Sequence, residues 1–460
     1  MSTIADAIAV APAARLRGRL RVPGDKSISH RALILATLAA GESTIDGAGD
    51  GADVRSTAGI MRSLGADVER GDDGSGGAMV RYRVASPGAD GLHKPTGALD
   101  CGNSGTSLRL IAGVLAGLPF RSVLDGDASL RRRPVARIIE PLRSMGAALH
   151  ARENDSLPPL TVVGRTPLRA IDVTTPVPSA QVKSAILLAG LRAEGRTTVR
   201  EAVATRDHTE RMLRARGVPV TREGGPAGVS WSLEGGQAVQ AVDERVPGDV
   251  SAAAFWLVAG ATHPDAVLTI EGVGVNPTRR AIIDLLRAMG ADVDERPILP
   301  TGAAESGEAG DRAEDDGVGE PLADLTVRSS DLRAIDLGPS DVAAAIDEIP
   351  ILCLAATQAR GTTTIRGAGE LRHKESDRIA GITAGLTSLG ADITIVGDDL
   401  RITGPSVLRG GLTDSLDDHR LAMTFAIAGL IARGAATVGR PSSAAISYPT
   451  FFSDLEGVRA

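Results

Sequence analysis

Apolar stretches recur along the chain in one arrangement. Each stretch is long enough to form a helix, and a glycine and a short segment rich in threonine or valine follow it, which is typical of a helix leading into a strand. The six stretches are SHRALILATLAAGESTI, SGTSLRLIAGVLAGLPFRSV, SAQVKSAILLAGLRAEGRTTV, VSAAAFWLVAGATHPDAVLTI, EIPILCLAATQARGTTTI and DHRLAMTFAIAGLIARGAATV. The pattern predicts six copies of an apolar helix followed by a strand.

A second motif alternates with these stretches. It begins like a helix end, passes through a glycine suited to a helix C-cap, and continues like the start of a strand. Its five copies are MRSLGADVE (61–69), LRSMGAALH (142–150), LRARGVPVT (213–221), LRAMGADVD (286–294) and LTSLGADIT (386–394). Their glycines lie 81, 71, 73 and 100 residues apart, so the motif marks a structural repeat.

Together the two motifs predict an α/β fold built from six repeats, each running strand, helix, strand, helix, strand, strand. Repeats of this kind bury their apolar faces against each other, and six of them suit two domains of three. We place the break near Val246, in the turn-rich segment DERVPGDV. The longest gap contains residues 301–321, which are acidic, rich in glycine and alanine and without periodicity, so we expect a disordered insertion there.

A polar segment precedes each apolar helix. The segments are GDKSISHR, CGNSGTSLR, PVPSAQVKS, PGDVSA, AIDE and SLDDHR. Capping alone explains PGDVSA, since a cap needs one Ser or Asp. Capping explains the other five segments together less well, because a cap does not require Lys, Arg, Gln or His as well. Helix N-termini attract anions. Several such ends in one place would form an anion-binding site.

Composition excludes several classes of protein. The chain has a formal net charge of −7 and a pI near 5.6, which argues against nucleic-acid binding. The two cysteines, Cys101 and Cys353, cannot form a disulfide framework or a cysteine-based zinc site. We identify neither a signal peptide nor an apolar run long enough to cross a membrane. We therefore expect a cytoplasmic protein that binds neither nucleic acid nor membrane.

Lysine is rare in this chain: 46 of its 50 basic residues are arginine, and Lys26, Lys183 and Lys374 are three of the four lysines. Lys26 and Lys183 fall in the polar segments above, and Lys374 lies in the charged segment LRHKESDRI (371–379). Arginine would serve a simple ion pair, so a retained lysine favours a need for a compact, movable ammonium, and we expect Lys26 to face an anionic substrate. The GDKS turn around Lys26 is not a P-loop, because the upstream glycine of that motif is missing.

Four segments hold most of the candidate chemistry. They are DCGNSGTSLR (100–109), GDASLRRRPVARI (126–138), LRHKESDRI (371–379) and LDDHRLAM (416–423). The arginines of the second segment suit bidentate contacts with carboxylate or phosphate, although a solvated basic face would look the same. Residues 371–379 would be an ordinary charged helix if considered alone.

In these segments the chain resembles the EPSP synthase family, the 5-enolpyruvylshikimate-3-phosphate synthases. GDKSISHRAL, GNSGTSLRL, RRRPV, SAQVKSA, LRHKESDRI and DDHRLAM match its motifs in order. The resemblance implies a two-domain inside-out α/β barrel, with three βαβαββ repeats per domain around a pseudo-threefold axis. It also implies a discontinuous first domain of residues 1–22 and 247–460, and a second domain of residues 23–246.

The family transfers the enolpyruvyl group of phosphoenolpyruvate to the 5-hydroxyl of shikimate-3-phosphate and releases phosphate, with no metal and no organic cofactor. It serves aromatic amino acid biosynthesis and is the target of glyphosate. By this resemblance, shikimate-3-phosphate would be held by Lys26, Ser27, Arg31, Ser179, Ala180, Gln181, Thr205, Asp347 and Lys374. Phosphoenolpyruvate would be held by Lys26, Asn103, Gly105, Arg133, Gln181, Arg378, His419 and Arg420. We expect these small molecules as partners, and a monomer.

Three of these residues would carry the chemistry. Lys26 would lie between the two substrates, and Asp347 would be the general base for the 5-hydroxyl. Glu375 would protonate the methylene carbon of phosphoenolpyruvate and later take a proton back. Two positions depart from common family patterns: Thr205 replaces Ser, and Ser447 stands where some members have Lys, which leaves glyphosate sensitivity open.

Two other functions remain possible at this point. The related enolpyruvyl transferase acting on UDP-N-acetylglucosamine normally has a reactive cysteine in the loop that here reads GDASLRRRP, and this loop has none. A non-catalytic anion-binding protein would not need the carboxylates of Asp347 and Glu375 in a site for anions.

Overall fold

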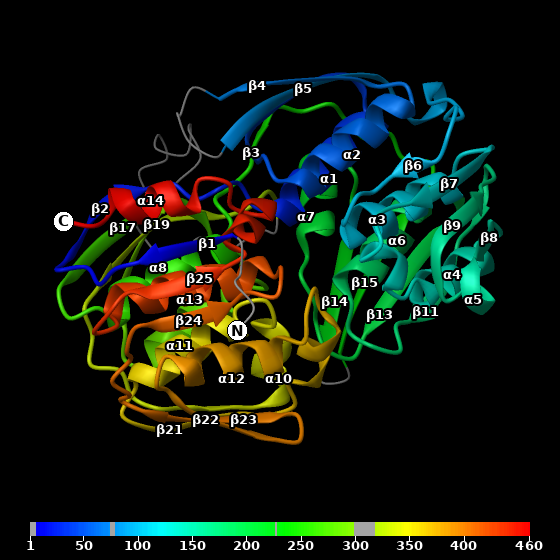
Figure 1. The fold of residues 1–460 in the computed structure, drawn as a ribbon. Coiled ribbons are helices and arrows are strands. Elements are labelled where there is room, and N and C mark those ends of the chain that lie inside the picture. The colour runs from blue at the N-terminus through cyan, green and yellow to red at the C-terminus, as the bar shows by residue number, and fades with distance from the viewer. Residues whose placement is uncertain (1–5, 74–78, 226–227, 299–317) are drawn as a thin grey trace. The chain divides into compact units, whose positions relative to one another are not determined.

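The computed structural model describes residues 6–73, 79–225, 228–298 and 318–460 (Figure 1). The described chain forms two compact units. Unit 1 contains residues 6–23, 247–298 and 321–460, and unit 2 contains residues 24–73, 79–225, 228–246 and 318–320. Within the described residues the chain therefore passes from one unit to the other after Pro23, after Val246 and after Glu320. Most of the predicted insertion, 301–321, lies outside the described residues.

Unit 2 contains three four-stranded sheets among its described residues, and all three share one order. One edge pair of strands runs parallel and the remaining pairs are antiparallel. The sheets are β16-β3-β5-β4 (Glu244–Arg245, Ala40–Gly49, Met79–Pro87, Asp67–Asp72), β6-β7-β9-β8 (Leu99–Asp100, Arg121–Asp125, Leu157–Val163, Ala148–Ala151) and β11-β13-β15-β14 (Asp172–Thr174, Arg196–Glu201, Gly228–Glu234, Thr221–Gly225), with a small parallel pair β10-β12 (Leu168–Arg169, Ala193–Glu194).

The helices of unit 2 alternate with these strands. The predicted order of strand, helix, strand, helix, strand, strand is followed by β6, α3, β7, α4, β8 and β9. The helices are α1 (Lys26–Leu38), α2 (Ala52–Ser63), α3 (Gly105–Ala116), α4 (Ala136–Ser144), α5 (Arg152–Asp155), α6 (Ala180–Gly190) and α7 (His208–Ala215). The mixed α/β class predicted from the sequence is confirmed.

Unit 1 contains two four-stranded sheets and one three-stranded sheet in its described part. The sheets are β18-β19-β17-β2 (Asp292–Ile298, Leu322–Arg328, Ala266–Gly274, Leu16–Leu20), β20-β21-β23-β22 (Asp336–Leu337, Gly361–Ile365, Asp399–Gly404, Asp392–Val396) and β1-β25-β24 (Ala7–Val10, Ala436–Gly439, Gly411–Asp414). Its helices are α8 (Val250–Thr262), α9 (Ala281–Ala288), α10 (Pro339–Ala344), α11 (Ile349–Gln358), α12 (Arg378–Ser388), α13 (His419–Ile431) and α14 (Phe451–Gly457). Strand β2 pairs in parallel with β17, from Leu16 with Ala266 to Leu20 with Ile270, which ties the N-terminal segment into this unit.

The six apolar stretches of the sequence form the helices at the centres of the two units. In unit 2 these are α1, α3 and α6, and in unit 1 they are α8, α11 and α13. Every residue of α8 from Val250 to Ala261 is buried. Helices that are apolar all round are stable only when they are enclosed on all sides, so each set of three forms the core of its unit.

The outer helices end as the second motif predicts. Gly65, Gly146, Gly217, Gly290 and Gly390 all have positive φ angles, from 77° to 109°. A left-handed residue directly after a helix satisfies the last carbonyl groups and turns the chain into the next strand, and glycine adopts this conformation without a steric penalty. The predicted glycine C-caps are confirmed.

The part of the chain that the structure describes contains no helix that is both long and apolar enough to span a membrane.

Helices α3 and α6 lie side by side (Figure 1), and their contact depends on a glycine. A Cβ atom on Gly113 would lie 2.2 Å from the carbonyl oxygen of Ala185, far inside contact distance.

We expect Gly113→Ala to lower the free energy of unfolding by about 1–3 kcal/mol through overpacking. Gly59→Ala, in the middle of α2 with nothing within 4 Å of the added methyl group, should instead be neutral or stabilising by roughly 0.5–1 kcal/mol. Urea denaturation of both variants checks this, and equal effects would contradict the packing described here.

Candidate active site

The N-terminal ends of the three core helices of unit 2 lie together. Side chains of Asp25, Ser104 and Ser179 cap α1, α3 and α6 by accepting hydrogen bonds from backbone N–H groups. In the first turns, Gln181 of α6 accepts from Arg109 at 2.6 Å and donates to Thr106 of α3 at 2.9 Å. Each cap satisfies one N–H group, so other donors and the positive ends of the helix dipoles remain directed toward this end of the unit.

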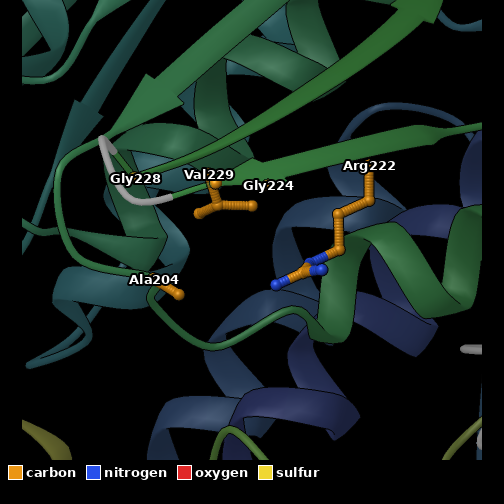
Figure 2. A pocket seen from close by; sticks show the side chains of 6 residues that line it. Ala204, Arg222, Gly224, Gly228 and Val229 are labelled. Atoms are coloured by element: carbon orange, nitrogen blue, oxygen red, sulfur yellow. The ribbon is translucent and has the colours of Figure 1, made fainter.

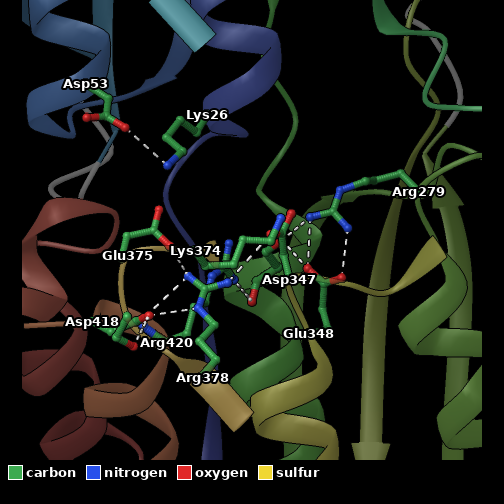
Figure 3. Close-up of polar contacts among 12 residues, drawn as sticks. Lys26, Asp53, Arg279, Asp347, Glu348, Lys374, Glu375, Arg378, Asp418 and Arg420 are labelled. Carbon is green, nitrogen blue, oxygen red and sulfur yellow. Dashed lines mark hydrogen bonds and ion pairs between the residues drawn. The ribbon is translucent and has the colours of Figure 1, made fainter. Parts of the chain in front are cut away.

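Lys26 is the first residue of α1. Its Nζ lies 3.3 Å from Oδ2 of Asp53, in the first turn of α2, and its side chain is 27% exposed (Figure 3). Ser27 follows in the same turn. The ammonium is thus oriented by a carboxylate and still accessible, as an ammonium that binds a substrate should be.

Arg31 points from α1 into a cluster of hydroxyl groups. Its guanidinium donates to Thr209 at 2.7 Å, to Ser184 at 2.9 Å and to the backbone carbonyl of Ser27 at 2.9 Å. Burial lowers the pKa of Arg31, and nearby Glu210 opposes that effect. The predicted binding residue Arg31 is therefore buried and held mainly by neutral groups.

His30, on the same helix, does not serve as an exposed base or binding group. It is fully buried and its Nδ1 lies 2.7 Å from Oγ1 of Thr57, which in turn lies 2.7 Å from Oγ of Ser107. Burial lowers the pKa of His30 to about 3. The ring is neutral at physiological pH and joins α1, α2 and α3 in the core.

Three of the predicted phosphoenolpyruvate-binding residues come together at the start of α3. Arg133 donates to the side-chain oxygen of Asn103 at 2.6 Å, and Asn103 donates to Asp127 at 2.7 Å. A Cβ atom on Gly105 would lie 2.8 Å from Nη1 of Arg109 and 3.8 Å from Nη1 of Arg133. The absence of a side chain at Gly105 therefore leaves room for these guanidinium groups at the helix end. Ser179 and Ala180 lie at the start of α6, next to Gln181.

Thr205 lies in the segment between β13 and α7, and its hydroxyl group hydrogen-bonds to the carboxylate of Glu201. The other Glu201 oxygen lies 2.9 Å from Nζ of Lys183, which also contacts Glu210 at 3.1 Å and donates to the backbone carbonyl of Thr205 at 3.4 Å. All three charged side chains are 0% exposed. Burial raises the pKa of Glu210.

This environment shows why a lysine stands at position 183. The donors of Lys183 are taken by Glu201, Glu210 and the Thr205 carbonyl inside unit 2. Its ammonium also lies 5.0 Å from the ring centre of Trp231, a favourable cation–π contact. The rarity of lysine pointed to a site that needs a compact cation, but it did not reveal that the partners of Lys183 are Glu201 and Glu210.

In unit 1, Arg378 is the centre of a cluster of charged side chains (Figure 3). Its Nε donates to Asp418 at 2.8 Å and its Nη2 to Glu375 at 2.5 Å, while Nη1 lies 3.8 Å from Oδ1 of Asp347. Burial alone would lower the pKa of Arg378, but the charges of Asp418 and Glu375 outweigh it and hold that pKa above its usual value. The guanidinium is thus charged, buried and fixed by several carboxylates.

Asp347 lies between two cations. Its Oδ1 is 4.0 Å from Nζ of Lys374 and 3.8 Å from the Arg378 guanidinium, and its side chain is 24% exposed. Lys374 and Glu375 precede α12, which Asp377 caps. The structure therefore brings Asp347, Lys374, Glu375 and Arg378 together, although Asp347 is far from the others in sequence.

The start of α13 completes this cluster. Asp418 caps the helix by accepting from the backbone N–H of Arg420 at 2.9 Å, and it pairs with Arg378 as well. Arg378 pulls the pKa of Asp418 below its usual value, against the effect of burial. Arg420 donates to the backbone carbonyl of Ser251 at 3.3 Å, and His419 is buried beside it. Asp418 was not among the candidate residues, although it lies within the DDHR segment.

A pocket of about 450 Å³ also opens in unit 2 (Figure 2). It is lined by Ala204, Arg222, Gly224, Gly225, Gly228 and Val229. The predicted site residues do not line it, although Ala204 immediately precedes Thr205. We therefore base the candidate site on the helix ends and not on this pocket.

Comparison with known proteins identifies the family. The family model for EPSP synthase (3-phosphoshikimate 1-carboxyvinyltransferase) matches residues 10–455. A 3-phosphoshikimate 1-carboxyvinyltransferase of Bacillus cereus is 47% identical over 442 residues, which cover 96% of each chain. The chain belongs to the EPSP synthase family. A homologue with the same name from Bacillus thuringiensis is also 47% identical, over 441 residues and 96% of each chain.

Solved structures agree with this assignment. The EPSP synthase of Acinetobacter baumannii superimposes with a TM-score of 0.84 at 39% identity, covering 98% of both chains. The enolpyruvyl transferase NikO of Streptomyces tendae gives a TM-score of 0.73 at 20% identity, covering 98% of this chain and 97% of its own. The second likeness establishes a shared fold only. The mixed α/β, two-domain fold expected from the resemblance to the family is confirmed.

The buried contacts of Lys183 lead to a test of its role. Lys183→Met would leave Glu201 and Glu210 buried without their cation, and breaking a buried pair in this way costs about 3–5 kcal/mol. We expect urea denaturation to show a loss of that size. Lys94→Met, at an exposed lysine of the same unit, should change the free energy of unfolding by less than about 0.5 kcal/mol. A Lys183→Met protein as stable as the Lys94→Met control would show that the buried ion cluster does not support the fold.

Proposed function

We propose that this protein transfers the enolpyruvyl group of phosphoenolpyruvate to the 5-hydroxyl of shikimate-3-phosphate, yielding 5-enolpyruvylshikimate-3-phosphate and phosphate. One observation carries the proposal beyond family membership. Asp347, Lys374, Glu375 and Arg378 form a single cluster in which two carboxylates face two cations. Binding an anion would need the cations alone, whereas proton transfer needs the carboxylates as well.

Both substrates carry a phosphate and a carboxylate, and the two units offer the groups that such anions need. We assign shikimate-3-phosphate to Lys26, Ser27, Arg31, Ser179, Ala180, Gln181, Thr205, Asp347 and Lys374. We assign phosphoenolpyruvate to Lys26, Asn103, Gly105, Arg133, Gln181, Arg378, His419 and Arg420. Guanidinium groups bind carboxylate and phosphate through paired hydrogen bonds, and helix N-termini add backbone donors.

The reaction then proceeds by addition and elimination. Asp347 takes the proton of the 5-hydroxyl as that oxygen bonds to C2 of phosphoenolpyruvate, and Glu375 gives a proton to the methylene carbon, C3. The product is a tetrahedral intermediate with a methyl group at C3. In the second step Glu375 takes a proton from this methyl group, the C2–C3 double bond re-forms and the C2–O bond to phosphate breaks. The proton that Asp347 took from the 5-hydroxyl leaves with the phosphate, which restores the ionised base.

Glu375 must be protonated for the first step, and its contact with Arg378 explains how substrate favours this. In the ligand-free protein the Arg378 cation stabilises the ionised form of Glu375 across 2.5 Å. An anionic substrate that takes the Arg378 donors removes this stabilisation and brings negative charge close to Glu375. Both effects favour protonation of the carboxyl group.

For the architecture, we propose that the two compact units are the two domains of the family, with the closed arrangement of three repeats around a pseudo-threefold axis. The cytoplasmic location and the monomeric state remain predictions from the sequence. The alternative acceptor, UDP-N-acetylglucosamine, is disfavoured because the GDASLRRRP loop has no cysteine.

A phosphate-release assay tests the function directly. The protein is incubated with phosphoenolpyruvate and either shikimate-3-phosphate or UDP-N-acetylglucosamine. We expect phosphate release with shikimate-3-phosphate alone. Release only with the sugar nucleotide would make the protein the related transferase, and binding of both substrates without release under any condition would favour a non-catalytic anion-binding protein.

Lys26 gives the sharpest test of the assigned residues. If its ammonium contacts both substrates, the larger and planar guanidinium of Lys26→Arg cannot reproduce those contacts. We expect kcat/KM to fall by roughly 100- to 1000-fold, the usual cost of losing a contact that strengthens in the transition state. The control is Lys94→Arg, which makes the same substitution at an exposed lysine and should leave kcat/KM unchanged. Wild-type kcat/KM for Lys26→Arg would refute the role assigned to Lys26.

A further inference from the structure

A second charged pair lies beside Asp347, deeper in unit 1. Arg279 and Glu348 form a bidentate ion pair, with Nη1–Oε2 and Nη2–Oε1 distances of 3.0 and 2.9 Å (Figure 3). Their side chains are 5% and 1% exposed. The hydroxyl group of Ser251, in the first turn of α8, hydrogen-bonds to both partners. None of these three residues was a candidate from the sequence.

The pair is joined to both groups of predicted site residues in unit 1. Glu348 directly follows Asp347 in the chain and is the N-cap residue of α11. On the other side, the carbonyl oxygen of Ser251 accepts from Nη1 of Arg420 at 3.3 Å. A shift of the Arg279–Glu348 pair would therefore move the backbone that carries Asp347 and the acceptor that holds Arg420.

The pair also balances the charge around Asp347. Lys374, just before α12, and Arg378, the first residue of α12, face the Asp347 carboxylate. Glu348 and Arg279 lie on its other side, with Asp249 near Arg279 and Arg420 near Glu348. Burial raises the pKa of Glu348, and the adjacent Asp347 carboxylate acts in the same direction. The charge and hydrogen bonds of Arg279 outweigh both and lower that pKa overall.

Stability alone gives little reason for such a pair. Well-packed apolar residues in place of a buried ion pair are often as stable or more stable, because two charges must lose their hydration. The neighbouring first turns of α8 and α11 are apolar apart from these polar groups, so an apolar contact would suit the core. A buried pair at this position is better explained by what it does to Asp347 and Arg420.

We propose that Arg279 and Glu348 are positioning residues for the reaction. The pair fixes Asp347 and Arg420, and Arg279 neutralises the Glu348 carboxylate, which lies next to the general base Asp347. This inference rests on the function proposed above and on the role of Asp347 as its base. Neither Arg279 nor Glu348 needs to touch a substrate.

Four variants test the proposal in the phosphate-release assay, with kcat measured against pH at saturating substrates. In Arg279→Met, the neighbouring carboxyl groups of Glu348 and Asp347 lose the cation that balanced their charges. The pair therefore keeps one proton up to a higher pH, and the acid limb of the profile should move up by roughly one pH unit. In Glu348→Gln, the unbalanced Arg279 cation favours ionised Asp347, so the acid limb should move down. Arg280→Met, which removes the adjacent arginine that pairs with Glu295 and Asp284, should leave the profile unchanged.

The double variant Arg279→Met with Glu348→Gln removes both charges and remains informative where a single variant does not fold. Its acid limb should return close to that of the wild type. Its kcat should still be lower by about 10- to 100-fold and its KM for phosphoenolpyruvate higher, because Asp347 and Arg420 lose their support.

The outcomes separate the possible errors. A purely structural role would lower the amount of folded protein without moving the acid limb in opposite directions. Folded single variants with wild-type pH profiles, or a double variant with wild-type kcat and KM, would overturn the proposal while leaving the enzymatic function intact. A wild-type protein that releases no phosphate would refute the proposed function itself.

Discussion

Each unit of this protein is organised around three helices that are buried along their length, and the burial places a strict demand on the helix ends. A buried helix cannot leave its first N–H groups to water, so they must meet side chains or a ligand. In both units the starts of these helices are linked by side chains. Gln181 of α6 donates to Thr106 of α3 in unit 2, and Ser251 of α8 contacts Glu348 at the start of α11 and Arg420 of α13 in unit 1. The donors and helix dipoles therefore gather at one end, and charged side chains gather with them.

The two units differ in the groups that surround the buried arginine near their helix starts. In unit 2, Arg31 is held mainly by hydroxyl and carbonyl oxygens, so its positive charge remains available to an anion. In unit 1, Arg378 is surrounded by the carboxylates of Asp418, Glu375 and Asp347. Carboxylates held against cations in this way can exchange protons when a substrate changes the local charge. In the proposed function, unit 2 therefore supplies anion-binding groups, and unit 1 supplies carboxylates for proton transfer as well as cations for phosphoenolpyruvate.

The sequence predicted what depends on local pattern. The apolar helices, their polar starts and the glycine C-caps follow from neighbouring residues, and all are present. It failed where partners come from distant segments. The rarity of lysine marked Lys183 as a site for a compact ammonium, but Glu201 and Glu210 could not be placed beside it from the sequence. Arg279 and Glu348 pair across 69 positions, and the two adjacent arginines of NPTRR give no sign of that contact.

The central claim is that the polar helix starts bind the anionic groups of the substrates. A crystal structure of the protein with shikimate-3-phosphate and phosphoenolpyruvate, or a non-reacting analogue of the latter, would locate the phosphorus atoms by anomalous scattering. We predict one at the starts of α1 and α6, within hydrogen-bonding reach of Lys26, Ser27 or Ser179, and one beside Arg378 and Arg420. Phosphorus atoms found instead in the pocket lined by Arg222 and Gly224, with the helix starts occupied by water alone, would contradict the account.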